Sequence, residues 1–271
     1  MSSPTFSGSV PKTYHDFLGP LIFDAYARDL TARITPLLNA NSKARILELA
    51  CGTGIVTECI AQALPSGASL IATDISEPML AHARTTYSGA PGVTFQTADA
   101  CALPFKDGSF DLIACQYGVM FFPDKVKAMR EARRVLAPGG AYIFNIWDSL
   151  EHNPIPRLVH ETLASLLPDN PIQFLAKMPY GYSDRAEIER VTRAGGFENV
   201  KIETVEFPSS APCAADAARA WVEGTPVLSA LLERGITDPA PFRIAAEKAI
   251  AANLGDKPCG ATMRAIVVTA S

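Results

Sequence analysis

Short apolar runs alternate along the chain with longer segments in which apolar residues recur every three to four positions. Runs of strand length occur at 45–49, 68–73, 93–97, 110–115 and 141–147, and helical periodicity occupies most of the segments between them. Strands that alternate with helices predict a parallel sheet with right-handed crossovers. Because the strands are almost continuously apolar, we expect helices on both faces of the sheet. The pattern therefore predicts an α/β fold with a doubly wound sheet.

Both ends of the chain and two internal segments depart from this alternation. Helical periodicity over 14–38, interrupted at Gly19-Pro20, predicts a short helix and then a longer one. Towards the C-terminus we expect helices at 184–194 and 241–254 and strands at 199–207 and 263–270. The proline-rich segment 149–182 and the proline-broken helical segment 208–240 are interpreted as lid insertions. The predicted parts are an N-terminal helical cap (1–42), a core (43–148), a lid (149–182) and a C-terminal part of the core (183–271) that holds the second insertion.

The turn after the first strand is built from small residues. It comprises Ala50, Cys51, Gly52, Thr53 and Gly54, and a helix follows it. Glycine leaves the backbone without a Cβ atom, so a ligand can lie directly against the main chain. The start of the helix presents unpaired N–H groups and a partial positive charge. These features predict a cradle for a nucleoside.

Acidic residues follow the first three strands. Glu48 lies near the end of strand one, Asp74 ends strand two and Asp99 follows strand three. Ligands of doubly wound sheets bind outside the carboxyl ends of the strands. A carboxylate at the position of Asp74 can accept two hydrogen bonds from a ribose diol, although it would also favour the start of the next helix. Asp99 could accept from an adenine amino group, or it could form a turn.

Composition and charge exclude several functional classes. The chain has 271 residues and a net charge of −4, without a basic face, which disfavours nucleic acid as a partner. No apolar run is long enough to span a membrane, and residues 1–12 lack the apolar region of a secretory signal. The six cysteines and four histidines have no zinc-site spacing. We therefore expect reduced thiols, no bound metal and a cytoplasmic protein.

Five motifs in the first half of the chain resemble those of one enzyme family. They are LELACGTG (47–54), TD (73–74), ADACALPF (98–105), FDLIACQYGVMFFPD (110–124) and LAPGGAYIF (136–144). Together they are similar to the class I S-adenosylmethionine-dependent methyltransferases, and most similar to the branch that acts on small molecules, which includes the ubiquinone/menaquinone C-methyltransferases. The resemblance is specific over residues 44–148. It implies a Rossmann-like, seven-stranded sheet whose last strand is antiparallel, and segment 263–270 matches that strand.

The resemblance also implies cofactor contacts, residue by residue. Glu48 would approach the methionine amino group, and Ala50, Cys51, Gly52 and Gly54 would form the turn under the cofactor. Asp74 would bind the ribose. Ile75 and Met79 would flank the adenine, and Asp99 and Ala100 would contact its amino group. Gln116 and Tyr117 would lie where the methyl group meets its acceptor. An aromatic residue of the first helix closes over the cofactor in related sequences, and Tyr14 and Phe17 are the candidates, although either could be a core residue.

The acceptor side of the predicted site is apolar and aromatic. We expect a small, largely apolar or aromatic metabolite, enclosed by the two insertions. An acceptor that is protonated at neutral pH requires a general base, for which His152 and Tyr180 are the candidates, with His15 and Asp148 as further possibilities. Methylation at oxygen, nitrogen or carbon is compatible with the sequence, as is any oligomeric state.

Two other functions are compatible with parts of the pattern. The chain could bind S-adenosylmethionine as a regulatory module without transferring a methyl group. It could instead be an NAD-dependent oxidoreductase, but the dinucleotide fingerprint requires G-x-G-x-x-G, and Thr57 stands at the third glycine position.

Overall fold

The computed structural model describes residue 6 and residues 8–271, so the first residues of the predicted cap lie outside the described part. The chain divides into two compact units. The sheet unit comprises Tyr26–Trp147, Tyr182–Val205 and Ala265–Ser271, and the helical unit comprises Met1–Ala25, Asp148–Gly181 and Glu206–Arg264. The assignment of 149–182 and 208–240 as insertions into a core remains a prediction.

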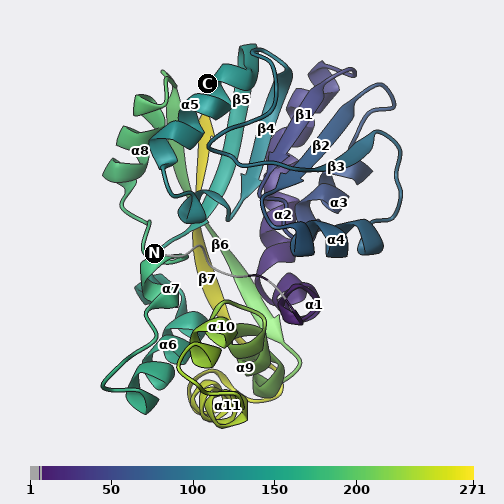
Figure 1. Ribbon diagram of the computed structural model, residues 1–271. Helices are drawn as coiled ribbons and strands as arrows, with labels where there is room; N and C mark the ends of the chain where they lie inside the picture. The colour runs from purple at the N-terminus through teal and green to yellow at the C-terminus, as the bar shows by residue number, and fades with distance from the viewer. Residues whose placement is uncertain (1–5, 7) are drawn as a thin grey trace. The chain divides into compact units, whose positions relative to one another are not determined.

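A seven-stranded sheet in the order β3-β2-β1-β4-β5-β7-β6 organises the fold (Figure 1). Strands β1, β2, β3, β4 and β5 pair in parallel, and β7 runs antiparallel to β5. The predicted class, a doubly wound sheet with an antiparallel last strand, is therefore confirmed. The strands are β1 (Arg45–Leu49), β2 (Ser69–Asp74), β3 (Val93–Thr97), β4 (Phe110–Gln116), β5 (Leu136–Trp147), β6 (Val200–Ala211) and β7 (Cys259–Ala270).

Helices cover both faces of the sheet in the sheet unit (Figure 1). On one face, α2 (Asp24–Ala40) and α3 (Ile55–Gln62) bury apolar side chains against strand residues that include Ile46 and Ile143. Next to them, α4 (Glu77–Thr86) buries Leu80 against Ala72 of β2. On the other face lie α5 (Lys125–Val135) and α8 (Arg185–Ala194), which pack against each other. Two-sided burial accounts for the continuous apolar strands in the sequence.

The helical unit is built around α9 and α11, which pack against each other and against α6. Its helices are α1 (Val10–Thr13), α6 (Pro154–Leu166), α7 (Phe174–Lys177), α9 (Ala214–Glu223), α10 (Val227–Leu232) and α11 (Ala240–Leu254). A π-helical segment, Tyr14–Phe23, follows α1 directly, and short 3₁₀ turns lie at Val119–Phe121 in the sheet unit and at Leu150–His152.

The structure corrects the prediction of a helix break at Gly19-Pro20. The backbone is helical from Val10 to Ala40, and Pro20 lies within the π-helical segment. There, the N–H of Asp24 donates to the carbonyl of Gly19, five residues earlier. A proline ring collides with the preceding turn of a regular α-helix. The wider π turn accommodates that ring, so the helix continues.

Three strands are longer than predicted. β5 begins at Leu136 instead of residue 141, β7 begins at Cys259 instead of residue 263, and β6 continues to Ala211. The prediction that the segment from residue 208 is helical is therefore wrong for its first four residues. The extension has a tertiary origin, because β6 and β7 are neighbours in the sheet. Their contact is close enough that a Cβ atom on Gly260 would lie 2.8 Å from the carbonyl oxygen of Ser209.

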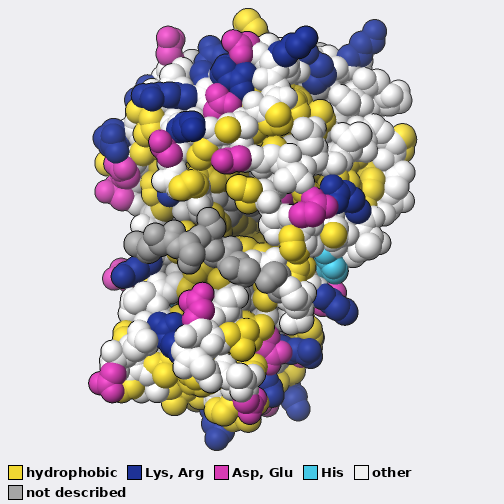
Figure 2. All heavy atoms as spheres, in the orientation of Figure 1, with side chains coloured by type: hydrophobic (Ala, Val, Ile, Leu, Met, Phe, Trp, Pro, Cys, Tyr) yellow, Lys and Arg dark blue, Asp and Glu magenta, His cyan; other side chains and the backbone are white. Residues whose placement is uncertain are grey.

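The surface shows no segregation of charge on the face in view. Acidic and basic side chains are interspersed there (Figure 2). Within the described residues, no helix combines the length and apolar character that crossing a bilayer requires.

Candidate functional site

The small-residue turn after β1 adopts backbone conformations that few side chains tolerate. Ala50, Gly52 and Gly54 have φ values of +53°, +57° and +84°. A Cβ atom on Gly54 would also lie 3.3 Å from the Cβ of Ala83 on α4. Gly54 is the N-cap of α3 and provides no side-chain oxygen to its first N–H groups. The turn thus presents bare backbone and an uncapped helix start, as the sequence predicted.

Asp74, the last residue of β2, accepts hydrogen bonds that hold this turn in place. One carboxylate oxygen accepts the N–H of Gly52 at 2.8 Å, and the other accepts the N–H of Ser76 at 2.8 Å. The backbone N–H of Cys51 donates to the carbonyl of Thr73 at 2.9 Å. Burial raises the pKa of Asp74, and the backbone donors oppose that rise. Asp74 therefore shapes the cradle, in addition to any ribose contact it makes.

Glu48 lies beneath the turn and is 1% exposed. One of its carboxylate oxygens accepts the hydroxyl of Thr57, in the first turn of α3, at 2.6 Å. Burial raises the pKa of Glu48 to about 8, the Thr57 hydrogen bond opposes the rise, and the charge of Asp74 adds to it. At neutral pH the carboxyl group is mostly protonated. A cationic ligand above the turn would favour its ionised form.

The predicted adenine contacts lie on adjacent elements of the sheet unit. Ile75 is a large apolar side chain that is 70% exposed, directly after Asp74, whereas Met79 is buried. Asp99 is exposed, and its carboxylate accepts the N–H of Cys101 at 2.8 Å, which makes it a turn-forming residue as well. Ala100 is buried. An adenine contact by these residues remains a prediction.

Cys51 is a structural residue of the turn. Its thiol is buried, and burial raises its pKa well above the ordinary value, with the nearby charges of Glu48 and Asp74 adding to the rise. A thiol that resists ionisation is a poor nucleophile. The residue therefore contributes backbone and volume to the cradle.

The end of β4 is held by contacts that the sequence analysis did not anticipate. Tyr117 has a φ of +55°, and its N–H donates to the backbone carbonyl of Asn145 at 3.0 Å and to the Asn145 side-chain oxygen at 3.1 Å. The Tyr117 ring stacks on Trp147 at 3.9 Å, and Tyr26 packs edge-on against both rings. A cluster of three buried aromatic rings thus stabilises an unusual backbone conformation at this strand end.

Gly118, two residues after the end of β4, packs closely against the turn that follows β1. A Cβ atom on Gly118 would lie 2.4 Å from the Cβ of Ala50 and 2.7 Å from the Sγ of Cys115. Such distances leave no room for a side chain. The methyl group of Ala50 therefore occupies the space over Gly118.

Four predicted site residues belong to the helical unit and have partners within it. Tyr14 stacks on Phe23 at 4.7 Å, and Arg219 lies 4.8 Å from the centre of the Phe17 ring. His152 Nδ1 lies 3.1 Å from the Ser149 hydroxyl and 3.8 Å from a carboxylate oxygen of Asp148. Tyr180 is 4% exposed, and its ring centre lies 6.1 Å from that of Trp221. Their cofactor and catalytic roles remain predictions.

Two of the residues that build the site were missed by sequence reasoning. The sequence pattern drew attention to Thr57 only because the dinucleotide fingerprint requires a glycine at that position. A threonine in the first turn of a helix can also reach an acid in the preceding strand. Asn145 stands alone among apolar residues in β5 and is fully buried. A polar residue inside an apolar strand requires hydrogen-bond partners, and that signal could have identified it.

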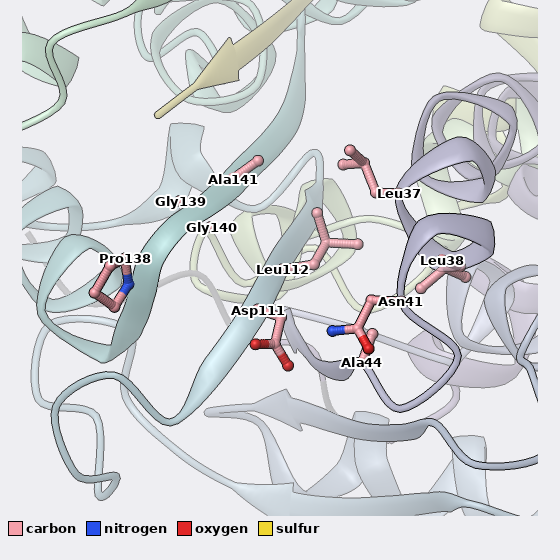
Figure 3. A pocket seen from close by; sticks show the side chains of 10 residues that line it. All are labelled: Leu37, Leu38, Asn41, Ala44, Asp111, Leu112, Pro138, Gly139, Gly140 and Ala141. Atoms are coloured by element: carbon pink, nitrogen blue, oxygen red, sulfur yellow. The ribbon is translucent and has the colours of Figure 1, made fainter.

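The sheet unit also contains a hollow with a volume of about 240 Å³ at the opposite ends of the strands. It is lined by the end of α2, including Leu37, and by the starts of β4 and β5, including Asp111 and Gly140 (Figure 3). Asp111 is the second residue of β4 and pairs with Arg45, the first residue of β1. The hollow is therefore separate from the turn, which follows the carboxyl end of β1.

The site fits an adenosine-type cofactor. It combines bare backbone in the turn, an uncapped helix start, a carboxylate at the end of β2 and an exposed isoleucine beside that carboxylate. Within the described part of the chain, no three histidine, cysteine, aspartate or glutamate side chains gather as a metal site.

Comparison with known proteins identifies the same part of the chain. Residues 47–144 match the family described as Methyltransferase domain. A demethylmenaquinone methyltransferase of Thermus thermophilus is 40% identical over 156 residues, covering 56% of this chain and 66% of that protein. A ubiquinone/menaquinone biosynthesis C-methyltransferase of Geobacter sulfurreducens is 31% identical over 138 residues, covering 50% of this chain and 53% of that protein. The chain thus spans about half to two thirds of the length of these relatives.

A solved structure shares the fold across most of the chain. Phosphoethanolamine N-methyltransferase 2 of Haemonchus contortus, crystallised with phosphomonomethylethanolamine and S-adenosylhomocysteine, superposes with a TM-score of 0.60 at 17% identity. The match covers 96% of this chain and 56% of that one. At this identity, the likeness concerns the fold alone.

Proposed function

Because the chain belongs to the class I S-adenosylmethionine-dependent methyltransferases, we propose that it transfers a methyl group to a small, largely apolar or aromatic metabolite. One observation supports this proposal above the others. The carboxylate of Asp74 holds the N–H groups of Gly52 and Ser76, so the glycine turn and the end of β2 form one rigid cradle at the switch point of the sheet.

When bound, S-adenosylmethionine supplies an already activated methyl group, so the main tasks of the chain are binding, orientation and exclusion of water. The bare backbone from Ala50 to Gly54 would support the cofactor, and Asp74 would bind its ribose. Glu48 would ionise as it meets the methionine ammonium group. Asp99 and Ile75 would contact the adenine.

The proposed acceptor is a quinone-type or similarly apolar ring compound. The names of the two bacterial relatives, which act in menaquinone or ubiquinone synthesis, support this class. The aromatic cluster of Tyr26, Tyr117 and Trp147 would contribute an apolar wall at the ends of β4 and β5. If the acceptor requires deprotonation, His152, whose ring nitrogen lies near Asp148, is the proposed base and Tyr180 the second candidate.

The proposed compartment is the cytoplasm. All six cysteines are free thiols, which is the state expected in a reducing environment. The proposed partner is the small-molecule acceptor.

Calorimetry with S-adenosylhomocysteine, followed by mass detection of methylated products from a metabolite extract, tests the function. We expect binding by the wild-type chain, loss of binding in Asp74→Ala, and unchanged binding in Asp107→Asn, a control at an exposed acid that pairs with Arg134. Absence of binding by the wild-type chain contradicts the proposal. Binding without any methylated product indicates a regulatory module, and binding of NAD instead indicates an oxidoreductase.

A further inference from the structure

The hollow at the opposite ends of the strands lies beside an irregularity in the pairing of β4 and β5. The two strands are in register at the pair Phe110–Leu136 and again at the pair Leu112–Ala141. Between these pairs β4 advances by two residues and β5 by five, so the extra residues of β5 bulge out of the ladder. They include Pro138-Gly139-Gly140, in which the proline has no N–H group for the ladder and the first glycine has a φ of +78°. A segment that cannot continue the ladder therefore forms one side of the hollow (Figure 3).

Apolar side chains form most of the wall of this hollow. Leu38, Ala44 and Leu112 are buried along it, and Ala141 lies on the β5 side. Leu37, in the last turn of α2, also lines the hollow and is 42% exposed. An apolar cavity of roughly 150 Å³ is sufficient to bind benzene. The volume here is about 240 Å³, so a single substituted aromatic ring fits.

Asn41 contributes a hydrogen-bond donor to the same hollow. The N–H of Lys43 donates to the Asn41 Oδ1 at 3.1 Å. A backbone N–H can only donate, so the other end of the Asn41 amide is the NH₂ group. In Figure 3 this nitrogen end points towards Asp111. Among the residues that the structure describes, none accepts a hydrogen bond from it.

Asp111 contributes a hydrogen-bond acceptor. Its Oδ2 accepts the backbone N–H of Arg45 at 2.8 Å and the Arg45 Nε at 3.2 Å, whereas its Oδ1 accepts only the Arg45 Nη2, at 3.3 Å, within the described part of the chain. Burial alone would raise the pKa of Asp111, but the hydrogen bonds and charge of Arg45 outweigh burial and lower that pKa. The carboxylate is therefore ionised at neutral pH and can only accept. Its Oδ1 retains lone pairs for a further donor.

We propose that this hollow is a second small-molecule site, separate from the cofactor cradle, and that it takes a monocyclic phenol. The ring would pack on Leu37 and Leu112, and its hydroxyl would donate to the Asp111 Oδ1 and accept from the Asn41 Nδ2. A hydroxyl group supplies both the donor and the acceptor that this arrangement requires. A neutral group also fits best, because Asp111 would repel a carboxylate and Arg45 would repel an ammonium group. The inference stands independently of methyl transfer.

Two variants separate the polar and the apolar parts of the site. In Asn41→Asp the carboxylate can still accept the N–H of Lys43, but the NH₂ donor is lost. Asn39→Asp, at an exposed position two residues earlier, controls for the added charge. Leu37→Ala shortens the apolar wall, and Leu232→Ala is its control, because Leu232 is 50% exposed on α10 in the helical unit.

The experiment titrates p-cresol and toluene, which differ only in the hydroxyl group, into ¹⁵N-labelled protein. Both should shift the backbone signals of Gly139 and Gly140 saturably, and p-cresol should also shift the Asn41 side-chain NH₂ signals, which are identified by their loss in Asn41→Asp. We expect the wild type, Asn39→Asp and Leu232→Ala to bind p-cresol roughly three- to tenfold more tightly than toluene. Asn41→Asp should lose most of this preference. Leu37→Ala should instead weaken both probes, by roughly three- to tenfold.

Two results overturn the inference. One is the absence of a saturable shift at Gly139 and Gly140 when p-cresol is added to the wild type, including the case in which p-cresol shifts only the signals of the turn after β1 and the end of β4. That case would leave the proposed function intact. The other is a preference for p-cresol over toluene that is unchanged in Asn41→Asp.

Discussion

Glu48→Gln is expected to remove a pH dependence from the stability of the sheet unit. Burial raises the pKa of Glu48 from 4.5 to about 8, against the hydrogen bond from Thr57 and with a contribution from the Asp74 charge. At neutral pH the folded chain therefore holds a proton that the unfolded chain has released. Stability from a raised pKa is complete below the unfolded value and is lost as pH rises through the folded value.

The size of the effect follows from the pKa difference. Each pKa unit corresponds to about 1.4 kcal/mol, so full ionisation of Glu48 costs the fold on the order of 4 to 5 kcal/mol. Between about pH 6 and about pH 8.5, this residue alone should lower the free energy of unfolding by roughly 2 to 3 kcal/mol. Glutamine resembles the protonated acid, and its oxygen can still accept the Thr57 hydroxyl. The variant should therefore match the wild type only below about pH 4.5, and it should exceed the wild type by about 2 kcal/mol near pH 6 and by roughly 4 to 5 kcal/mol near pH 8.5.

Urea unfolding monitored by the fluorescence of Trp147 measures this difference. Trp147 lies in the sheet unit and is 2% exposed, and a Trp221→Phe background removes the signal from the helical unit. The informative quantity is the free energy of unfolding of Glu48→Gln minus that of the parent, followed across the pH range. Glu198→Gln, at an exposed position, is the control. If the free energy of unfolding of Glu48→Gln minus that of the parent stays constant from about pH 6 to about pH 8.5, the reasoning is refuted.

Three further predictions concern the cradle. First, binding of S-adenosylhomocysteine near pH 7 should release a proton from Glu48, because an adjacent ammonium group lowers its pKa; calorimetry in two buffers of different ionisation enthalpy should show it in the wild type and not in Glu48→Gln. Second, Asp74→Asn should cost about 1 to 3 kcal/mol in the free energy of unfolding, because an amide NH₂ group must face one of two N–H donors; an unchanged urea midpoint would contradict this. Third, Gly118→Ala should cost about 1 to 3 kcal/mol through its contacts with Ala50 and Cys115, and adding Ala50→Gly should recover part of the loss; no recovery in thermal unfolding would show that Ala50 is not the obstacle.

The local chemistry of the sequence was sufficient for most of the architecture. The apolar runs predicted β1 to β5 in their correct order along the chain. The structure adds that the side chains of Asp124 and Asp184 cap α5 and α8, which is a local interaction of a residue type that favours this position. The glycine turn was predictable for the same reason, because the positive φ values at Gly52 and Gly54 are a property of the residue type. These features depend on neighbours only a few residues away.

Contacts between distant segments decided the rest. The sequence determined that a carboxyl group stands at position 48 and an amide at position 145. Only the packing of α3 and β4 against them made Glu48 a buried acid paired with Thr57, and Asn145 a buried amide whose oxygen accepts the N–H of Tyr117. The added residues of β6 and β7 exist because the two strands are neighbours in one sheet, and the helix through Pro20 continues because its turns widen. Burial and pairing depend on which surfaces meet, and that information resides in the folded chain as a whole rather than in any short stretch of it.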